Sequence, residues 1–482
     1  MKILFVAGEV YPLAKTGGLA DVVGALPKAF RSLGDEVRVM LPGYPEAMAR
    51  VAETGRPLPL ADAMGYGAAR IVPARMPDSN LDVFLVDCPE AFARPGGPYQ
   101  DADGRDWPDN ARRFALLSRA AALLGVGGGL AGWQPDIVHA HDWQTGLVPV
   151  YMRQWGGSTA GSVFTIHNLH YQGVFPPAVL GEIGVDPALF TIDALEYWGN
   201  VSLLKAGLVF SDYLTTVSPT YAREIQTEGF GYGLDGVVRW RAQTLRGILN
   251  GIDPEIWSPE VDAAIAQPYS VSDVSGKARC KAALQAAAGL APDAQAPLLG
   301  LLGRLVWQKG VDIVLDALPE IVEMGFQVVI QGAGEPALEA RCREAAAIFA
   351  GKVAAHIGYD ETFAHVIEAG ADVLAVPSRF EPCGLTQMYA LRYGTLPVVR
   401  RTGGLADSVA DVGETPDGTG FVFDGEAPAD FLAALIRARE LYDRPAAWAE
   451  VRARGMTKDF SWRAAAVRYR EVYEAVLRAR RG

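Results

Sequence analysis

The sequence TGGLAD occurs twice in this chain, at Thr16–Asp21 and again at Thr402–Asp407. Each copy follows a short apolar run and precedes a pattern that predicts a helix. Paired glycines in that place let backbone N–H groups approach an anion at the helix N-terminus, where the helix dipole also favours negative charge. A Gly-Gly pair is also common as a plain strand-to-helix turn. Two copies near opposite ends of the chain favour two similar nucleotide-binding halves with a ligand between them.

Short apolar runs alternate with helical patterns along most of the chain. This alternation predicts an α/β fold whose parallel sheets are covered by helices on both faces. The predicted strands are Lys2–Val6, Glu36–Leu41, Leu81–Val86, Ile137–Ala140, Ser162–Ile166 and Leu214–Val217 in the first half, and Leu298–Gly303, Gln327–Gln331, Val353–Ile357, Val373–Pro377 and Leu396–Val399 in the second.

The length of 482 residues is too great for one ordinary core, so we predict two large domains. Turn-forming residues cluster at Asn250–Pro259 (NGIDPEIWSP) and mark the joint. The predicted boundaries are residues 1–248, 249–459 and 460–482. The last segment contains Trp462–Arg481, which has the pattern of an amphipathic helix with one face formed by Val467, Val472, Val476 and Leu477.

The composition is that of a soluble globular protein, with 50% hydrophobic and 21% charged residues. The net charge of −12 argues against nucleic acid or an anionic membrane as the main partner, because both require a basic surface. No apolar run is long enough to cross a bilayer. The four cysteines are scattered and form neither a disulfide framework nor a metal motif, so we expect a protein of the reducing cytoplasm.

Polar residues just after a predicted strand are candidate site residues, because open α/β sheets bind ligands at the carboxyl ends of their strands. Lys15 stands beside the first Gly-Gly turn, where it is placed to neutralise a phosphate. Asp142 follows the strand that ends in HAH and is suited to accept a hydrogen bond from a hydroxyl group. His167 and Asn168 end the next strand and can donate to a sugar or a phosphate, although Asn168 can also cap a turn. A metal in the HAHD sequence is disfavoured, since Asp142 falls on the opposite face of the strand from the two histidines.

The second half carries cations in the same kind of position. Arg304 and Lys309 lie in one loop, GRLVWQKG, directly after a predicted strand. Two positive side chains in that place are better explained by binding of a diphosphate than by a solvent-exposed surface.

The sequence SRFEPCGLT (Ser378–Thr386) follows another predicted strand and contains one carboxylate, Glu381. The backbone N–H groups that open the next predicted helix, Leu385–Tyr393, are expected to point at an anion; they belong to Gly384, Leu385 and Thr386. We interpret Cys383 as a packing or ligand-contact residue, because no obvious base lies near it.

Several catalytic motifs are absent, including GxSxG, HExxH and the Walker GxxxxGK[ST] sequence. A nicotinamide dehydrogenase is disfavoured as well. The stretch Gly332–Glu335 begins like a dinucleotide-binding fingerprint but lacks its third glycine.

Long motifs in a fixed order resemble those of bacterial glycogen synthases, the ADP-glucose-dependent relatives of plant starch synthases. They are KTGGLADVVGALP (Lys15–Pro27), HAHDW (His139–Trp143), TIHN (Thr165–Asn168), NGID (Asn250–Asp253), GRLVWQKG (Gly303–Gly310) and PSRFEPCGLTQMYALRYG (Pro377–Gly394). The resemblance covers nearly the whole chain. It implies a GT-B fold: two Rossmann-like domains, the first on the acceptor side and the second binding the nucleotide sugar, with the site in the interdomain cleft. It also implies that the C-terminal helix crosses back onto the first domain.

The same resemblance implies an activity: transfer of glucose from ADP-glucose to the 4-OH at the non-reducing end of an α-1,4-glucan, with retention of configuration and without a metal or other cofactor. The implied catalytic residues are Glu381, Arg304, Lys309, His167 and Asp142. The implied donor-binding residues are Lys15, Gly18, Asn250, Cys383, Gly384, Leu385 and Thr386, together with Tyr359, which would stack on the adenine. The residues implied to lie near the glucan are Glu9 and Tyr99. Many retaining relatives carry a second Glu that binds the ribose, but this chain has Tyr389 there.

The residue types favour front-face substitution over a double displacement. A double displacement needs two carboxylates about 5 Å apart, and Glu381 is the one strong candidate. Arg304, Lys309 and the helix N-terminus after Cys383 are expected to stabilise the departing ADP. The backbone carbonyl of His167 is expected to stabilise the sugar as it becomes oxocarbenium-like, and the leaving phosphate takes the acceptor proton.

Other functions stay open from the sequence. One is a GT-B transferase that uses a different nucleotide sugar or acceptor. Another is a glucan-binding protein that has lost catalysis, which the complete set of Lys15, Arg304, Lys309 and Glu381 argues against. The two Gly-Gly turns are expected to converge on one ligand, with the second copy meeting the sugar-phosphate end of that ligand.

Overall fold

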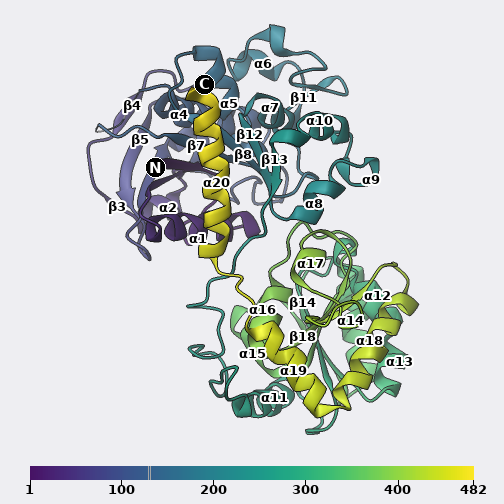
Figure 1. Ribbon diagram of the computed structural model, residues 1–482. Coiled ribbons are helices and arrows are strands. Elements are labelled where there is room, and N and C mark those ends of the chain that lie inside the picture. The colour runs from purple at the N-terminus through teal and green to yellow at the C-terminus, as the bar shows by residue number, and fades with distance from the viewer. Residues whose placement is uncertain (129, 131, 482) are drawn as a thin grey trace. The chain divides into compact units, whose positions relative to one another are not determined.

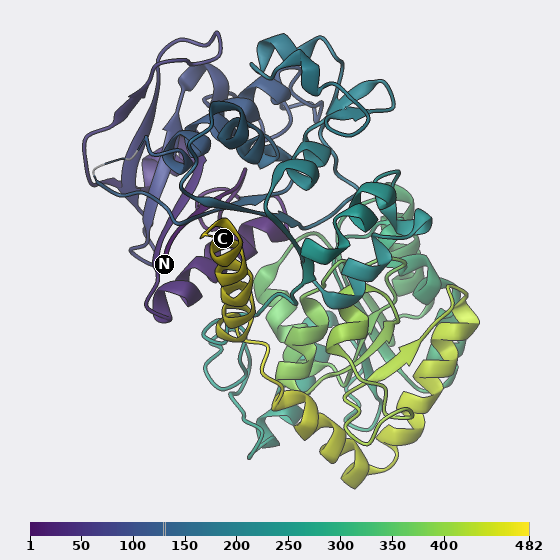
Figure 2. The ribbon, with the colours of Figure 1, turned by 45° about the horizontal axis from the view of Figure 1, so that its top comes forward.

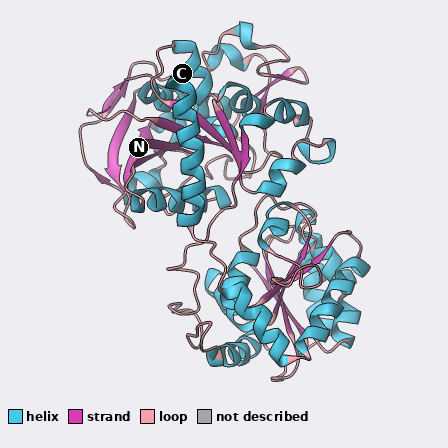
Figure 3. Ribbon diagram, viewed as in Figure 1, coloured by secondary structure: helices cyan, strands magenta, loops and turns pink. Residues whose placement is uncertain are grey.

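The computed structural model describes residues 1–128, 130 and 132–481. Contacts between residues divide the chain into two compact units (Figure 1). Unit 1 comprises residues 1–217 and 222–251 together with the C-terminal helix α20 (Trp462–Arg481). Unit 2 comprises Ser218–Tyr221 and Ile252–Ser461. In each unit helices pack around a central sheet, as the colouring by secondary structure in Figure 3 shows.

The sheet of unit 1 has ten strands in the order β13-β12-β8-β7-β1-β2-β6-β5-β3, with β4 beside β5. Its parallel strands are β1 (Lys2–Val6), β2 (Glu36–Pro42), β6 (Asp82–Asp87), β7 (Ile137–His141), β8 (Gly161–Ile166), β12 (Tyr213–Thr216) and β13 (Leu245–Gly247). All strands predicted for the first half are present here, each within one residue at either end. In central strand β1, the residues from Ile3 to Val6 are fully buried, which is why it reads as an unbroken apolar run.

One edge of this sheet is antiparallel, so the prediction of purely parallel sheets is wrong there. Strand β5 (Ala69–Arg75) pairs antiparallel with β6, and β3 (Ala52–Glu53) and β4 (Leu58–Leu60) pair antiparallel with β5. An antiparallel strand needs only one apolar face, so these stretches lack the continuous apolar run used to find strands. A small antiparallel sheet was also missed: β9 (Val174–Phe175), β10 (Glu196–Tyr197) and β11 (Asn200–Ser202).

The C-terminal helix α20 packs against helix α1 (Gly18–Ser32), beside the sheet of unit 1 (Figure 2). Its buried face includes Tyr469, Tyr473 and Val476, and the ring of Tyr473 stacks on Phe30 at 5.2 Å. The predicted helix bounds are confirmed, but Val467, which was placed on the apolar face, is 46% exposed. The further helices before residue 252 are α2 (Pro45–Arg50), α3 (Pro89–Phe92), α4 (Asn110–Gly125), α5 (Val148–Trp155), α6 (Val179–Glu182), α7 (Leu203–Phe210), α8 (Pro219–Glu224), α9 (Glu228–Gly231) and α10 (Asp235–Trp240).

The sheet of unit 2 is parallel throughout, in the order β16-β15-β14-β17-β18-β19. Its strands are β14 (Leu298–Leu302), β15 (Gln327–Gly332), β16 (Val353–Ile357), β17 (Val373–Val376), β18 (Leu396–Arg400) and β19 (Phe421–Phe423). Only β19 was not predicted. The helices are α11 (Ser275–Ala288), α12 (Val311–Asp316), α13 (Leu318–Glu323), α14 (Pro336–Ile348), α15 (Glu361–Gly370), α16 (Thr386–Tyr393), α17 (Gly403–Ser408), α18 (Pro428–Tyr442) and α19 (Pro445–Met456).

The helix predicted after the second TGGLAD copy is shorter than its apolar pattern. Helix α17 ends at Ser408, and Val409 is already extended. Among the residues that the structure describes, no helix is both long enough and apolar enough to span a bilayer.

Candidate active site

The loop after β1 is held in place by the carboxylate of Glu9, which is only 3% exposed. This carboxylate accepts hydrogen bonds from the backbone N–H groups of Thr16 and Gly17, and from the Thr16 hydroxyl at 3.0 Å. The Tyr99 hydroxyl donates to the same carboxylate at 3.3 Å. Burial raises the pKa of Glu9, while these hydrogen bonds lower it. Two N–H groups of the first Gly-Gly turn are therefore already occupied by a side chain of the protein.

The two glycines of the first TGGLAD copy have open space beside them. Helix α1 begins at Gly18, and a Cβ atom added at Gly17 or Gly18 would meet no atom within 4 Å. Lys15 forms an ion pair with Asp21 at 2.8 Å, and its side chain keeps 38% of its surface exposed. The turn thus has free space beside it and a cation at its edge.

The carboxyl ends of β7 and β8 meet at Asp142. The carboxylate of Asp142 accepts from the backbone N–H of His167 at 2.7 Å and from that of Asn168. Burial raises the pKa of Asp142 to about 7, against the lowering effect of these two bonds. Asp142 itself has a positive φ of 56°, a conformation that is uncommon outside glycine. It fixes the backbone at His167, and with it the direction of the His167 carbonyl group.

Three histidines form a group behind this turn, of which His139 and His141 are fully buried and His167 is half-buried. His139 contacts the Thr165 hydroxyl through Nε2 at 2.5 Å and the Tyr473 hydroxyl through Nδ1 at 2.7 Å. His141 contacts His167 through a 2.9 Å hydrogen bond between ring nitrogens. Burial lowers the pKa of His167 to about 3 and holds those of His139 and His141 well below the usual value, so all three are neutral near pH 7.

Asn250 ends the run of residues that follows β13. The side chain is 7% exposed, and its Oδ1 atom is buried without a hydrogen-bond partner among the described residues. A buried amide oxygen in that state is suited to receive a donor from a ligand.

In unit 2, Lys309 and Glu381 form an ion pair with 2.5 Å between Nζ and Oε2. The Ser378 hydroxyl donates to the same carboxylate oxygen at 3.0 Å. Arg304 is exposed and has no carboxylate within ion-pair distance in the described part of the chain; its one side-chain contact is with Gln308, at 3.4 Å. The loops after β14 and β17 therefore meet at the Glu381 carboxylate, which neutralises Lys309 but not Arg304.

The start of α16 offers unused backbone donors. Gly384 has a positive φ of 74°, and its Cβ position is filled by the side chain of Gln387. Gln387 donates to the carbonyl groups of Cys383 and Gly384, both at 3.1 Å. None of the N–H groups of Gly384, Leu385 and Thr386 donates to another of the described residues. These groups, a helix N-terminus and Lys309 together form an anion-binding arrangement.

The second TGGLAD copy is packed beneath this loop. A Cβ atom at Gly403 would lie 1.9 Å from the Glu381 carbonyl oxygen, and one at Gly404 would lie 2.1 Å from that of Cys383. The N–H of Gly404 donates to the Glu381 carbonyl at 3.1 Å. Gly404 therefore supports the loop that carries Glu381, and the meeting of this copy with the sugar-phosphate end of the ligand stays a prediction.

Unit 2 contains an exposed tyrosine and a stack of three rings. Tyr359 is 78% exposed, and its hydroxyl donates to Glu361 at 3.0 Å. Tyr389 stacks on Trp257 with 3.9 Å between ring centres, and Trp257 stacks on His365 at 3.8 Å. In the sequence, Tyr389 stands out only as the place of a missing carboxylate. Its stacking partners come from distant parts of the chain, so no local pattern could have revealed them.

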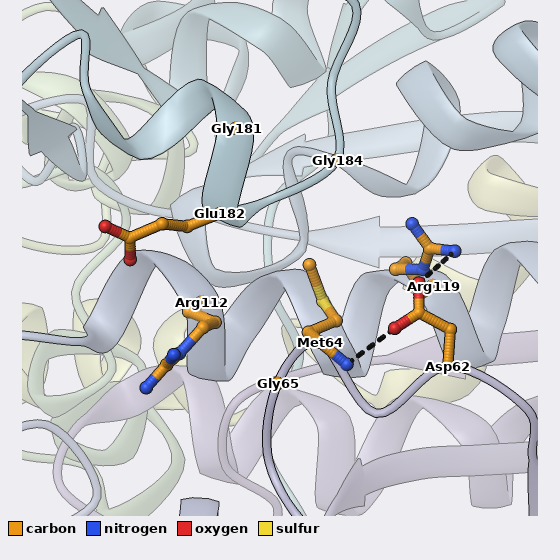
Figure 4. A pocket seen from close by; sticks show the side chains of 8 residues that line it. All are labelled: Asp62, Met64, Gly65, Arg112, Arg119, Gly181, Glu182 and Gly184. Carbon is orange, nitrogen blue, oxygen red and sulfur yellow. Dashed lines mark hydrogen bonds and ion pairs between the residues drawn. The ribbon is translucent and has the colours of Figure 1, made fainter.

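Unit 1 also contains a pocket, shown in Figure 4. It is lined by Asp62, Met64, Gly65, Arg112, Arg119, Gly181, Glu182 and Gly184. Arg119 is paired with Asp62 at 3.0 Å, and the lining contains as many carboxylates as guanidinium groups. None of the residues predicted for the site lines this pocket.

Clusters of potential metal ligands are missing from the residues that the structure describes. These residues contain no group of three or more His, Cys, Asp or Glu side chains arranged around a common point. The four cysteines are buried, and none of them forms a disulfide within the described part of the chain.

Comparisons with known proteins identify the family of the chain. Residues 2–240 match the family model described as the starch synthase catalytic domain, and residues 296–440 match that of glycosyl transferases group 1. The glycogen synthase of Rhodospirillum rubrum is 50% identical over 478 residues, covering 99% of each chain. That of Paramagnetospirillum magneticum is 48% identical over 482 residues, covering 99% of this chain and 98% of the relative.

Two solved structures resemble this chain in fold. The catalytic domain of starch synthase IV from Arabidopsis thaliana, bound to ADP and acarbose, superposes with a TM-score of 0.87 at 34% identity, covering 98% of this chain and 99% of that one. Sucrose-phosphate synthase from Thermosynechococcus elongatus shares the fold, with a TM-score of 0.60 at 17% identity. The predicted GT-B fold class is confirmed by these neighbours. By sequence over its full length and by fold, the chain belongs to the family of glycogen synthases.

Proposed function

We propose that the chain transfers glucose from ADP-glucose to the non-reducing 4-OH of an α-1,4-glucan such as glycogen, with release of ADP and retention of configuration. The family supports this activity through relatives that are about half identical over their whole length. The observation in this chain that carries the proposal is the anion-binding arrangement at the start of α16, next to Lys309 and Glu381.

Unit 2 is proposed to bind the nucleotide sugar. The free N–H groups of Gly384, Leu385 and Thr386 and the unneutralised Arg304 suit the diphosphate, which carries the negative charge of the donor. Tyr359 exposes most of its ring and suits the adenine. Cys383 lies in the same loop and is proposed to contact the glucose.

Unit 1 is proposed to serve the glucose and the acceptor. Asp142 holds the turn that presents His167, and Asn250 offers a buried amide oxygen without a partner. Lys15 and Gly18 are proposed to contact the donor from the open first Gly-Gly turn. Glu9 and Tyr99 are proposed to lie near the glucan, although Glu9 also holds the loop.

The proposed reaction is a front-face substitution at C1 of glucose. The bond between C1 and the diphosphate oxygen breaks, and its electrons leave with ADP. The acceptor 4-OH oxygen forms the new bond on the same face, and its proton passes to the leaving phosphate. Lys309, Arg304 and the N-terminus of α16 stabilise the developing charge on ADP, while the His167 carbonyl stabilises the positive sugar.

Glu381 fits this scheme better as a counter-ion than as a nucleophile. It is 7% exposed, is paired with Lys309, and accepts from Ser378. A carboxylate with these partners keeps Lys309 positioned for the phosphate. Replacing Glu381 by Gln should therefore lower the rate without abolishing turnover, whereas a nucleophile would leave none.

Release of ADP from ADP-glucose, with and without glycogen, tests the proposal. Glycogen-dependent ADP release is expected, with much slower release from UDP-glucose in the parallel assay for UDP. Binding of glycogen without turnover would instead identify a glucan-binding protein that has lost catalysis. Equal turnover of both nucleotide sugars would overturn the ADP-glucose preference and leave the transferase function standing.

A further inference from the structure

The ring nitrogens of His141 and His167 share one hydrogen bond inside unit 1. The distance between His141 Nδ1 and His167 Nε2 is 2.9 Å. Such a bond needs one N–H group and one lone pair, so the two rings must be in complementary states. His141 is fully buried, whereas His167 is half-buried.

The two possible directions of this hydrogen bond differ in the state of His141 Nε2, the ring nitrogen that does not take part in it. The Nε2 atom of His141 is buried and has no partner among the described residues. If His167 donated the shared bond, His141 would have to carry its proton on Nε2, as a buried donor without an acceptor. If His141 donates from Nδ1, only an unused lone pair is left at Nε2. Buried donors without partners are the rarer and costlier of the two.

We propose that His141 is a positioning residue that fixes the tautomer of His167, so that His167 carries its proton on Nδ1 and offers this N–H to the bound sugar. The inference rests on the proposed function, because it assigns the Nδ1 of His167 to the same site. The ligand group that it recognises is an oxygen lone pair on the glucosyl group or on the glucan.

The orientation of His141 is fixed by its neighbours. Its ring stacks on Phe5 with 5.6 Å between ring centres and an angle of 16° between planes. On another side lies the ring of His139 at 4.1 Å, which in turn accepts or donates a hydrogen bond with Tyr473 of α20. His139 and Tyr473 are also fully buried. Helix α20 therefore helps to fix the ring of His141, through the contact of Tyr473 with His139.

A neutral donor suits the proposed chemistry. The sugar becomes positively charged as the C1 bond breaks, and a protonated imidazole beside it would oppose that charge. Burial lowers the pKa of His167 to about 3, so its ring stays neutral at the pH of the reaction. A neutral ring with a fixed N–H binds an oxygen without adding a charge.

Nitrogen-15 NMR of the histidine rings in the full chain tests the tautomer directly. The chain has six histidines, and each can be assigned by a single substitution. The expected spectrum of the free protein has His167 protonated on Nδ1 and bare on Nε2, and His141 in the same tautomer. A protonated Nε2 on His167 overturns the proposal. Since no substrate is present, this result is independent of whether the proposed activity is correct.

Ligands identify which oxygen is bound. ADP alone is expected to leave the Nδ1 signal of His167 unchanged. A shift with ADP-glucose would place the acceptor oxygen on the glucosyl group, and a shift with a maltooligosaccharide would place it on the glucan. Unchanged signals with all three ligands would overturn the role of this N–H.

Substitutions at His141 measure the effect on catalysis. His141→Leu removes the donor and is expected to lower kcat/KM about tenfold, which corresponds to the loss of one hydrogen bond. His141→Asn keeps an N–H near the position of Nδ1 and is expected to recover most of the rate. The matched control is His356→Leu, an exposed histidine of unit 2. Full activity in His141→Leu, with an unchanged His167 spectrum, would contradict the proposal.

Discussion

The first TGGLAD copy is open, whereas the second is packed beneath the loop that carries Glu381. At Gly17 and Gly18 an added Cβ would meet nothing within 4 Å. At Gly403 and Gly404 it would meet backbone atoms at 1.9 and 2.1 Å. Identical sequence therefore serves two purposes: in one copy the missing side chain leaves room for a ligand, and in the other it leaves room for the protein's own backbone.

The aspartates of the two copies differ in the same way. Asp21 forms an ion pair with Lys15 in which both side chains are about a third exposed. Asp407 instead accepts from the backbone N–H and the hydroxyl of Thr220, at 2.6 and 2.8 Å. The first copy thus leaves space that the proposed ligand could use, and the second is a structural support for the loop that carries Glu381.

The largest expected effect is that acid destabilises the unit with the first copy before the other. His139, His141 and His167 have lowered pKa values in the folded state. The unfolded chain therefore binds more protons below pH 6.5, and folded stability falls as the pH decreases through that value. For His167 alone the loss at pH 5 is about 2 kcal/mol, and protonation of Asp142 returns a similar amount, so the expected net loss comes from His139 and His141. Hydrogen exchange at pH 7 and pH 5, corrected for intrinsic rates, should show faster opening of β7 than of β15.

Two groups work against this effect and set its limits. The pKa of Asp142 is raised to about 7 and that of Glu9 is also raised, so both favour the folded state as the pH falls. In unit 2, Glu368 is fully buried with a raised pKa, which makes that unit more resistant to acid. Equal loss of protection in both units would contradict the comparison. The exposed His356, replaced by Gln, should change nothing.

The next largest difference between the two copies is expected in stability, when one glycine of each copy is replaced by alanine. Gly404→Ala forces a Cβ against the Cys383 backbone and should destabilise the chain by about 3 kcal/mol, as overpacked sites do. Gly18→Ala has free space and lies in a helix, so stability should stay the same or rise by up to about 1 kcal/mol. Urea unfolding followed by circular dichroism measures both. If Gly404→Ala were as stable as the parent chain, the support role of the second copy would be wrong.

The lysines next to the two turns should differ in catalysis. Lys309→Ala should lower kcat about 100-fold, because it removes a charge from the departing ADP. Lys15→Ala should lower kcat/KM only about tenfold, since Lys15 is exposed and shares its charge with Asp21. Steady-state ADP release at saturating and limiting ADP-glucose gives both values. Lys352→Ala, an exposed lysine of unit 2, is the control, and a Lys309→Ala enzyme with normal kcat would remove Lys309 from the mechanism.

The smallest effect is expected at the aspartates. Asp407→Ala leaves the Thr220 donors without their acceptor and should cost about 2 kcal/mol of stability. Asp21→Ala breaks an exposed ion pair and should cost less than about 0.5 kcal/mol. Urea unfolding of the two variants side by side decides this, and equal losses would show that both copies are structural supports.

Most strands of the parallel sheets and helix α20 could be predicted from the sequence, because a buried parallel strand reads as a continuous apolar run and an amphipathic helix has a regular period. The short parallel strands β13 and β19, of three residues each, were missed. The edge strands β3, β4 and β5 could not, since their pairing is antiparallel and only one face is buried. Residues such as Glu381 and Lys309 could be proposed because polar side chains follow strands at a known edge of the sheet. Their contact at 2.5 Å could not, since 72 residues separate them.

The sequence by itself determined the fold class, the family and the positions of the charged and glycine-rich loops, because these depend on local periodicity and on motifs of contiguous residues. The tertiary structure alone decided which glycines of TGGLAD are open and which are packed, because that depends on backbone atoms brought from elsewhere in the chain. It also decided that Glu9 occupies the first turn and that His141 faces His167, since hydrogen bonds between distant residues leave no trace in local sequence.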